Sequence, residues 1–187
     1  MAAYAFARIK FPGREILFLF VLIQMMVPGQ IFIIPQYLMV QKLGMLNSIS
    51  ALVFPGIVTA FGTFLLRQFF MGLPEEIEEA AIIDGANRWQ IFWRVMLPLA
   101  KPGIATITML SAMGFWNEYP LALVLLTDDA KKTLPIGMAN LFEVQKYATD
   151  WGALFAGLVI IMIPTMIIYL IGQRYLLQGI GAGGLKG

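Results

Sequence analysis

The chain has 187 residues, of which 59% are apolar and only 13% are charged, and its mean hydropathy is +0.79. Ordinary soluble domains have about 45–50% apolar and about 25% charged residues, so the composition excludes that class and predicts a membrane protein. The absence of cysteine and histidine excludes disulfide frameworks, thiol nucleophiles, zinc sites and imidazole acid–base chemistry. The net charge of +2 does not indicate nucleic-acid binding.

Four segments are long and apolar enough to cross a membrane as helices. A hydrocarbon core about 30 Å thick requires about 20 residues at about 1.5 Å each. Pro28 and Pro35 are expected to kink or break the first segment, and neighbouring helices can satisfy the backbone groups that such breaks free. We therefore predict an all-α polytopic membrane bundle that forms one domain over residues 1–187. The predicted spans are residues 16–37, 49–70, 103–126 and 153–171.

The lysines and arginines outside the spans predict the orientation of the chain. Such residues accumulate in cytoplasmic loops, and a cytoplasmic N-terminus places nine of them inside and four outside. Both termini and the loop of residues 72–98 are then cytoplasmic, whereas the loop of residues 127–151 is outside. The inside group is Arg8, Lys10, Arg14, Arg67, Arg88, Arg94, Lys101, Arg174 and Lys186, and the outside group is Lys42, Lys131, Lys132 and Lys146.

The loop of residues 72–98 is predicted to begin with a short helix. Pro74 suits the first position of a helix, the glutamates after it favour the positive end of the helix dipole, and Gly85 suits the left-handed residue that ends a helix. Ile77, Ala80 and Ala81 share one face at helical spacing and predict a small apolar surface for a partner. A loop helix whose glutamates are simply solvated is the alternative interpretation.

A second helix is predicted between Asn87, as its N-cap with Gln90 three residues later, and Pro98, which ends it. One face of this helix is aromatic and apolar, and we expect that face at the membrane interface. Its members are Trp89, Phe92, Trp93 and Met96.

The order of residues in this loop resembles a known signature. Glu79-Ala80-Ala81, Gly85, Val95 and Leu97-Pro98 are similar to the pattern E-A-A-x₃-G-x₉-I-x-L-P of permease subunits in binding-protein-dependent ABC importers, with valine in place of isoleucine. Other segments resemble the carbohydrate-importing, MalG-type branch of that family. These are Tyr4-Ala5-Phe6-Ala7-Arg8, Phe11-Pro12-Gly13-Arg14, Trp116-Asn117-Glu118-Tyr119, Thr133-Leu134-Pro135-Ile136-Gly137 and the stretch from Gln173-Arg174-Tyr175 to Gly183-Gly184-Leu185-Lys186-Gly187.

The resemblance implies a type I importer permease fold in the inner membrane of a bacterial or archaeal cell. It also implies three partners: an ATPase dimer, a second permease subunit and an extracytoplasmic solute-binding protein. The sequence has no G-x₄-G-K-[ST] motif, so we expect ATP and magnesium on the ATPase and no cofactor on this chain. The family usually has six spans, and the two that precede the present four are either missing from this sequence or absent by nature.

The resemblance also implies that the E-A-A loop is a coupling helix that docks on the ATPase. We expect Glu79 to pair with a basic residue of the ATPase, Ala80 and Ala81 to permit close approach, and Gly85 to form the bend after the helix. The implied coupling residues are Glu79, Ala80, Ala81, Gly85, Leu97 and Pro98.

Glu118 is an ionisable residue inside the predicted third span. Because the burial of a charge within a membrane is costly, such a residue is a candidate for a functional role. Together with Trp116, Asn117 and Tyr119 it suits a sugar, which has apolar C–H patches and many hydroxyl groups. A hydrogen bond that joins neighbouring helices is an equal alternative.

Other functions remain open on the sequence alone. An ion-coupled secondary transporter also has broken helices and a carboxylate at membrane depth. An ABC importer permease for a non-sugar solute is a second alternative, and a non-transporting scaffold, suggested by the short chain, is a third. Gly179, Gly181 and Gly184 match the dinucleotide fingerprint, but they follow a membrane helix instead of a strand, so we reject that site. The charged loop of residues 127–151 is either a binding-protein contact or a solvated surface.

Overall fold

The computed structural model describes residues 1–144 and 150–184, and the regular elements within these ranges are all helical. Lys146 and Lys186, two of the cations used to predict the orientation, lie outside the described residues. The described chain divides into two compact units. One contains residues 1–27, 58–110 and 172–184, and the other contains residues 28–57, 111–144 and 150–171.

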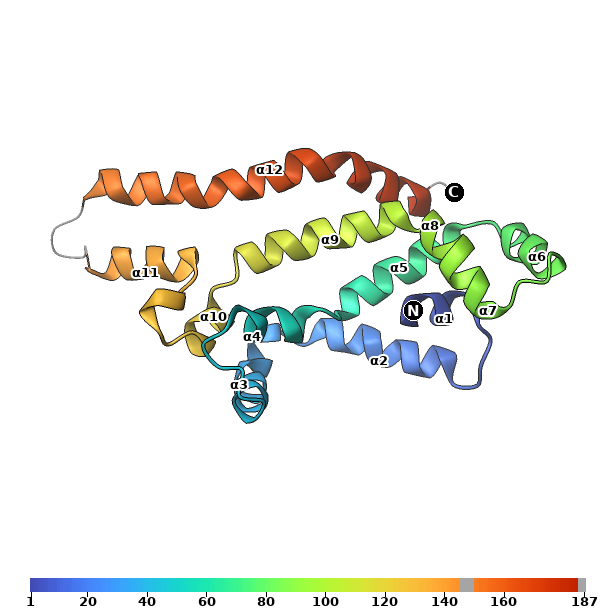
Figure 1. Cartoon of the computed structure of the whole chain (residues 1–187), viewed down its shortest axis with the longest axis horizontal. Helices are drawn as coiled ribbons and strands as arrows, with labels where there is room; N and C mark the ends of the chain where they lie inside the picture. Colours follow the sequence, from blue (N-terminus) through green and yellow to red (C-terminus); the bar gives the residue numbers. More distant parts are fainter. Residues whose placement is uncertain (145–149, 185–187) are drawn as a thin grey trace. The chain divides into compact units, whose positions relative to one another are not determined.

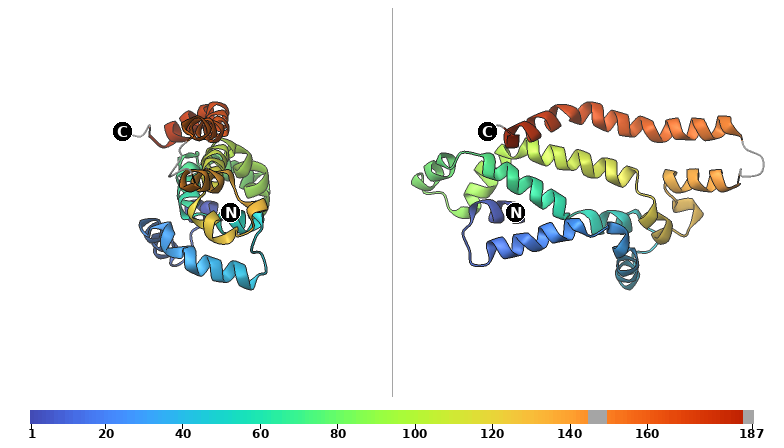
Figure 2. Two further views of the ribbon diagram at one scale, coloured as in Figure 1. Left: turned by 90° about the vertical axis from the view of Figure 1, so that its left-hand side faces the viewer. Right: turned by 180° about the vertical axis from the view of Figure 1, so that it is seen from behind.

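The first unit is built around a short N-terminal helix. Helix α1 (Ala2–Arg8) lies beside α5 (Ala60–Gly72), and α2 (Arg14–Met26) follows it (Figures 1 and 2). The remaining elements are α6 (Glu76–Ile83), α7 (Arg88–Gln90), η3 (Ile91–Met96), α8 (Leu97–Leu99) and the first part of α9 (Lys101–Trp116). The core of this unit joins α1, α5 and η3 through Ala3, Tyr4, Phe70, Ile91, Phe92, Met96 and Ala100.

The helix predicted to stop at Pro98 continues through it to Leu99. Proline removes one backbone N–H from the hydrogen-bond ladder, and the preceding residues Ile91–Met96 form a π-helix, whose wider turns are typical of such local disruptions. The expected interfacial face is also wrong in part. Phe92 and Met96 are buried in the core, whereas Trp89 and Trp93 are 64% and 54% exposed, because the core lies on one side of η3.

The second unit packs short helices around a small apolar core. Its elements are η1 (Gly29–Phe32), α3 (Ile33–Lys42), α4 (Ile49–Val53), η2 (Phe54–Gly56), α10 (Pro120–Leu125), η4 (Asp129–Lys131), α11 (Leu134–Val144) and α12 (Trp151–Gly184) as far as Ile171. The core consists of Val40, Ala51, Leu52, Ala122, Leu125, Leu126 and Ile136. The loop predicted over residues 127–151 is therefore partly helical, and Ile136 of α11 is fully buried.

One described helix is long and apolar enough to cross a membrane by itself. Residues Trp151–Tyr175 of α12 contain an 18-residue stretch with a mean hydropathy of 2.6. The helix over the predicted fourth span is therefore confirmed and extends beyond the prediction at both ends. Three further spans are possible only if pairs of helices joined at a bend each count as one, namely Arg14–Met26 with Gly29–Lys42, Ile49–Gly56 with Ala60–Gly72, and Arg88–Leu99 with Lys101–Trp116.

Each of the three other predicted spans is broken. The first breaks at Val27-Pro28, as its prolines predicted, and the second breaks after Pro55-Gly56, where Thr59 caps α5 by accepting a hydrogen bond from the Gly62 N–H at 3.0 Å. The third was predicted as residues 103–126, but α9 ends at Trp116 and α10 starts at Pro120, because proline lacks the N–H to continue a helix. Helix α12 runs through Gly179, Gly181 and Gly184, so these glycines follow no strand.

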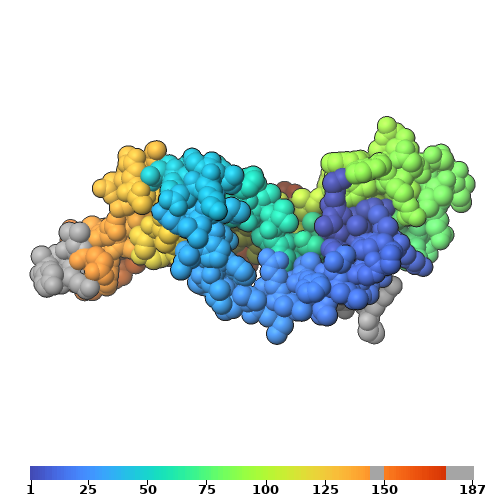
Figure 3. All heavy atoms as spheres, turned by 90° about the horizontal axis from the view of Figure 1, so that it is seen from below, coloured from blue at the N-terminus to red at the C-terminus, as the bar shows by residue number. Residues whose placement is uncertain are grey.

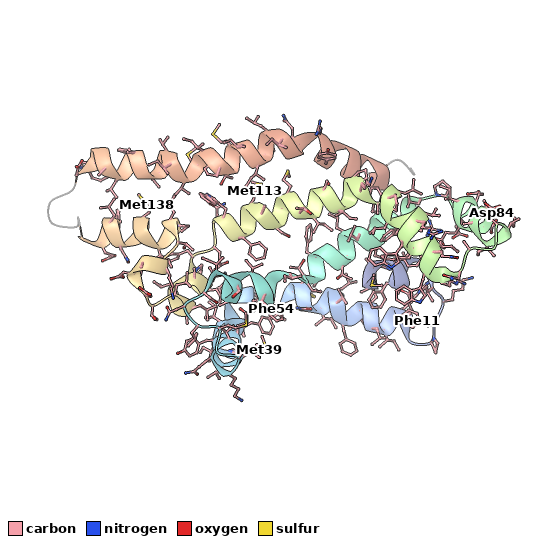
Figure 4. All side chains as sticks on the ribbon, viewed as in Figure 1. Phe11, Met39, Phe54, Asp84, Met113 and Met138 are labelled. Atoms are coloured by element: carbon pink, nitrogen blue, oxygen red, sulfur yellow. The ribbon has the colours of Figure 1, made fainter. Side chains whose placement is uncertain are left out.

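A glycine allows α11 to approach α12 closely. A Cβ at Gly157 would collide with the sulfur of Met138 and would lie 2.6 Å from its Cε. Met138 lies on the side of α11 that faces α12 (Figure 4). The helix α11, which lies within the predicted outer loop, therefore packs against α12, the helix of the predicted fourth span.

Asn47 joins the turn between α3 and α4 to the segment after α10. Its backbone is left-handed, with φ at 56°, and its Oδ1 accepts three hydrogen bonds, from the Thr127 N–H at 2.7 Å, the Thr127 hydroxyl at 3.0 Å and the Asp128 N–H at 3.0 Å. Its own N–H donates to the Leu125 carbonyl at 3.0 Å. One side chain thus satisfies the polar groups where the two segments meet.

We predict that Asn47→Ala destabilises the fold by about 1–3 kcal/mol, because three donors lose their acceptor and alanine is disfavoured at positive φ. Thermal unfolding of the purified chain in detergent measures the effect as a lower midpoint. Asn47→Asp is the matched control, since it keeps the acceptor oxygens and tolerates the left-handed backbone. Equal midpoints for Asn47→Ala and the wild type would contradict this role.

Candidate functional site

The C-terminal end of α6 is fixed by its own sequence, as predicted, whereas the helix begins at Glu76 and not at Pro74, which was predicted to be its first residue. Gly85 has φ at +79°, its N–H donates to the Ile82 carbonyl at 3.0 Å, and the next N–H, of Ala86, donates to the Ala81 carbonyl at 3.0 Å. This pair of hydrogen bonds is the Schellman motif, which satisfies the last carbonyls of a helix. The sharp turn at Gly85 then leads directly into α7.

Helix α7 begins with the predicted capping box. The Asn87 side chain accepts from the Gln90 N–H at 3.0 Å, and the Gln90 side chain accepts from the Asn87 N–H at 2.9 Å. The two N–H groups that the helix start leaves free are satisfied reciprocally. Both ends of the turn between α6 and α7 are therefore fixed by local hydrogen bonds.

The exposed face of α6 carries glutamates, an alanine and an isoleucine. Glu76, Glu79, Ala80 and Ile83 are exposed, Ile83 by 85%, and their spacing of three and four residues places them on one side of the helix. Asp84 lies at the C-terminal end of this helix (Figure 4). The face predicted from Ile77, Ala80 and Ala81 is divided, because Ile77 and Ala81 are half-buried and Ala81 packs against the core.

The opposite face of α6 carries a buried carboxylate, which contradicts the alternative interpretation that all the glutamates of this helix are solvated. Glu78 is 8% exposed, and its Oε2 accepts a hydrogen bond from the Tyr4 hydroxyl at 3.3 Å. Its Oε1 lies 3.2 Å from the Arg8 Nε. Figure 3 shows the N-terminal segment, in dark blue, packed against the green segment that contains α6 and α7.

Arg8 connects this carboxylate to α5. Its Nε and a terminal nitrogen both donate to the Phe70 carbonyl, at 3.1 and 2.7 Å, and the same terminal nitrogen donates to the Leu73 carbonyl. These carbonyls lie at the C-terminal end of α5, where a positive charge is favourable. The other terminal nitrogen lies 3.4 Å from the exposed carboxylate of Glu75.

Arg67 of α5 makes the reverse connection to α1. Its Nε donates to the Phe6 carbonyl at 3.2 Å, near the end of α1, and its guanidinium lies 3.9 Å from the centre of the Phe18 ring. Its terminal nitrogen lies 3.5 Å from Glu15. Both arginines contributed to the predicted orientation, and Arg8 also belongs to a segment that resembles the MalG-type branch, but neither was predicted to make these contacts. The signal for a site was the spacing of Tyr4 and Arg8, which places them one turn apart on the same face.

The environment of Tyr4 favours its protonated form. Burial, and then the nearby negative charge of Glu78 and its hydrogen bond, raise the pKa of the Tyr4 hydroxyl above 10.0. The stability that this hydroxyl contributes is therefore complete below pH 10 and is lost as the pH rises through the raised pKa. The Tyr4 hydroxyl therefore stays protonated and uncharged at physiological pH and can donate its hydrogen bond to Glu78.

The residues of the E-A-A signature fall into two structural groups. Glu79, Ala80 and Gly85 lie on or beside the exposed part of α6, whereas Leu97 is half-buried and packs with Val95 against the core of the first unit. Pro98 is exposed. The structure therefore brings the first group together on a surface and gives Leu97 a packing role.

The four residues predicted for a solute pathway lie at the break between α9 and α10. The Trp116 indole donates to the Ile161 carbonyl at 3.0 Å, in the turn of α12 that contains Pro164. The Asn117 amide donates to the Met113 carbonyl at 2.8 Å, and Glu118 accepts from the Leu121 N–H at 2.9 Å. Tyr119 is 36% exposed. Three of the four thus satisfy backbone groups at a helix end or beside a proline.

Comparison with known proteins gives consistent matches over nearly the whole chain. Residues 1–181 match the family described as binding-protein-dependent transport system inner membrane component. The chain is 38% identical over 187 residues to the arabinooligosaccharides transport system permease protein AraQ of Halalkalibacterium halodurans, covering all of this chain and 66% of that protein. It is 37% identical over 185 residues to the diacetylchitobiose uptake system permease protein NgcG of Streptomyces coelicolor, covering 98% and 61%.

A third relative is the sn-glycerol-3-phosphate transport system permease protein UgpE of Yersinia pestis, 32% identical over 180 residues, with coverage of 96% and 64%. Among solved structures, a chain of a bacterial ABC transporter involved in the import of the acidic polysaccharide alginate matches with a TM-score of 0.74 and 33% identity, covering 92% of this chain and 65% of that one. The chain spans less than two thirds of the length of these relatives. The chain belongs to the family of binding-protein-dependent transport system inner membrane components and has the helical fold of an ABC importer permease.

Proposed function

We propose that the chain is a permease subunit of an ATP-driven importer and that α6 is its docking helix for the ATPase. The exposed face of α6 is the observation that supports this most directly, because it combines apolar, small and acidic side chains on a helix whose C-terminal end is fixed by the turn at Gly85. Family membership supports the same function. An ion-coupled carrier has no need of such a face.

The chemistry of this face defines its partner. Ile83 is 85% exposed, and its burial in an apolar cleft is worth about 1.5–3 kcal/mol. Ala80 has no side chain beyond Cβ and permits close approach. Within the described part of the chain the Glu79 carboxylate has no ion pair, so it is available to a basic residue at the edge of the cleft.

The proposed assembly contains this chain, a second permease subunit, an ATPase dimer and an extracytoplasmic solute-binding protein in a lipid membrane. ATP and magnesium act on the ATPase subunits, and no nucleic acid is involved. The orientation that places α6 beside the ATPase is the one with both termini in the cytoplasm. Arg8, Arg14, Arg67, Arg88 and Lys101 are then on the same side of the membrane as α6, in agreement with the distribution of positive charge.

The proposed solute is a sugar or a sugar-like molecule. The names of the relatives support this class, since they include permeases for arabinooligosaccharides and for diacetylchitobiose and an alginate importer. Discontinuous helices often form solute sites in transporters. We therefore propose that the break at Trp116, Asn117, Glu118 and Tyr119 borders the pathway, with Tyr119 as an exposed aromatic surface for the sugar ring.

The assembly can be tested by purifying the complex from native membranes with a tag on this chain and reconstituting it in proteoliposomes. We expect an ATPase, a second permease and a solute-binding protein to co-purify, and uptake of labelled oligosaccharides to require ATP. Uptake driven by a proton or sodium gradient without ATP would identify an ion-coupled carrier instead. Solute-independent ATPase activity with no uptake of any tested sugar would contradict the sugar permease.

We predict that Glu79→Lys leaves insertion in the membrane unchanged but lowers ATP-driven uptake at least about tenfold, because a like charge opposite a basic residue costs several kcal/mol. Glu79→Gln is the matched control, since it keeps the shape of the side chain, and should have a smaller effect. Uptake per amount of inserted chain is the measurement. Wild-type uptake in Glu79→Lys would refute docking through this residue.

We predict that Gly85→Val weakens the docking of the ATPase on α6 more than Gly85→Asn does. The left-handed backbone at Gly85 costs about 1–2 kcal/mol for ordinary residues, and β-branched valine is among the least suited to it, whereas asparagine tolerates it. Space is not the obstacle, because a Cβ at this position has no neighbour within 4 Å. The measurement is the amount of ATPase that co-purifies with each variant. Equal retention by both variants would show that the turn geometry is unimportant.

We predict that Glu118→Gln lowers the apparent solute affinity of assembled complexes about fivefold, the difference between a charged and a neutral hydrogen bond. Glutamine can still accept from the Leu121 N–H, so α10 keeps its cap. Asn117→Ala, which removes the hydrogen bond to Met113, serves as a comparison for a purely structural loss. If both variants alter assembly yet leave solute affinity unchanged, the four residues have no role in the pathway.

A further inference from the structure

The strongest unexplained feature is the N-terminal segment Tyr4-Ala5-Phe6-Ala7-Arg8, which lies between two elements of the proposed mechanism. Tyr4 and Arg8 both contact Glu78 on the buried side of α6, and Arg8 also binds the last carbonyls of α5. All of these residues belong to the first unit. Helix α1 therefore touches the docking helix and the end of a possible membrane span at once.

Arg8 is shared between acceptors on two different helices. Its side chain is only 7% exposed, so its donors must find partners inside the protein. The Nε has one hydrogen, which points to the Phe70 carbonyl at 3.1 Å, although the Oε1 of Glu78 lies almost as close, at 3.2 Å. The Oε1 itself receives no hydrogen bond from the described residues.

This arrangement is costly as a purely structural contact. Removing two charges from water carries a large penalty, and apolar side chains of similar volume often stabilise a fold as well or better. The Glu78 carboxylate also leaves one buried oxygen without a hydrogen bond, which adds to the penalty. The single Nε–H thus has two acceptors at nearly the same distance, the Phe70 carbonyl of α5 and the Glu78 carboxylate of α6.

We propose that Arg8 is a positioning residue that transmits movement of α6 to α5, with Glu78 as its partner on α6 and Tyr4 holding Glu78 in place. This inference rests on the proposed function of α6 as the docking helix. When the ATPase moves α6, the guanidinium follows the Glu78 carboxylate and pulls on the Phe70 and Leu73 carbonyls at the end of α5. The docking face of α6 stays unchanged, because Glu78 lies on the opposite side.

The test is Glu78→Gln in the reconstituted complex, measured as solute molecules taken up per ATP hydrolysed. Glutamine keeps the shape of the side chain and an acceptor for Tyr4 but loses the charge that attracts Arg8. We expect the complex to assemble and hydrolyse ATP, while the uptake per ATP falls about tenfold, within the range typical of coupling between two sites. Glu75→Gln, at the N-cap of the same helix, is the matched control. Its carboxylate also faces Arg8 but its side chain is 83% exposed, so we expect a near wild-type ratio.

Arg8→Lys separates transmission from simple stabilisation. Lysine keeps the positive charge but lacks the planar fork that can bind α5 and α6 together. We expect it to restore assembly better than Arg8→Gln while its uptake per ATP stays low. The double variant Arg8→Gln/Glu78→Gln should be no worse than Arg8→Gln alone, because the two residues act through one another.

The outcomes separate this inference from the proposed function. If the wild-type complex shows no ATP-driven uptake, the proposed function is wrong. If the wild type transports and Glu79→Lys does not, but assembled Glu78→Gln complexes keep the wild-type ratio, only the role of Arg8 is wrong. If Glu78→Gln reduces the amount of complex and the remaining complexes keep the wild-type ratio, the cluster merely holds the fold together and the inference is again overturned.

Discussion

Two arginines join α1 and α5 by binding the carbonyl groups at the ends of these helices. Arg8 of α1 donates to carbonyls at the end of α5, and Arg67 of α5 donates to the Phe6 carbonyl near the end of α1. Helix ends leave carbonyls without partners, and a chain of this composition has few polar groups to supply donors. The position of α1 on α5, and through Glu78 the position of α6, depends on these two side chains.

The sequence predicted the local features of the docking helix well, because they depend on residues close in the chain. The left-handed Gly85 and the capping box of Asn87 and Gln90 both follow from backbone preferences within a few residues, and the structure confirms them. Which side of α6 is buried and which is exposed could not be predicted in the same way. The four glutamates of residues 75–79 look alike in the sequence, and only the contacts with α1 and the core distinguish buried Glu78 from exposed Glu79.

The predicted spans show the same division between local and tertiary information. Hydropathy located all four apolar segments, and the prolines of the first predicted its break. The end of the third segment was predicted too late because residues 120–126 are as apolar as the helix before them, whereas the structure starts a new helix at Pro120. The pathway residues were placed within a continuous helix for that reason, and their hydrogen bonds to Ile161, Met113 and Leu121 became visible only in the structure.

The breaks in the possible spans bear on how the chain enters a membrane during synthesis. A broken segment exposes backbone N–H and C=O groups, each of which costs several kcal/mol in hydrocarbon until a neighbour satisfies it. Among the described helices α12 alone passes the length and hydropathy test without a bend, and it follows the three broken segments in the chain. The three broken segments are therefore synthesised before the one described helix that continues without such a break, so they depend on other parts of the protein for these hydrogen bonds to a greater extent than α12 does.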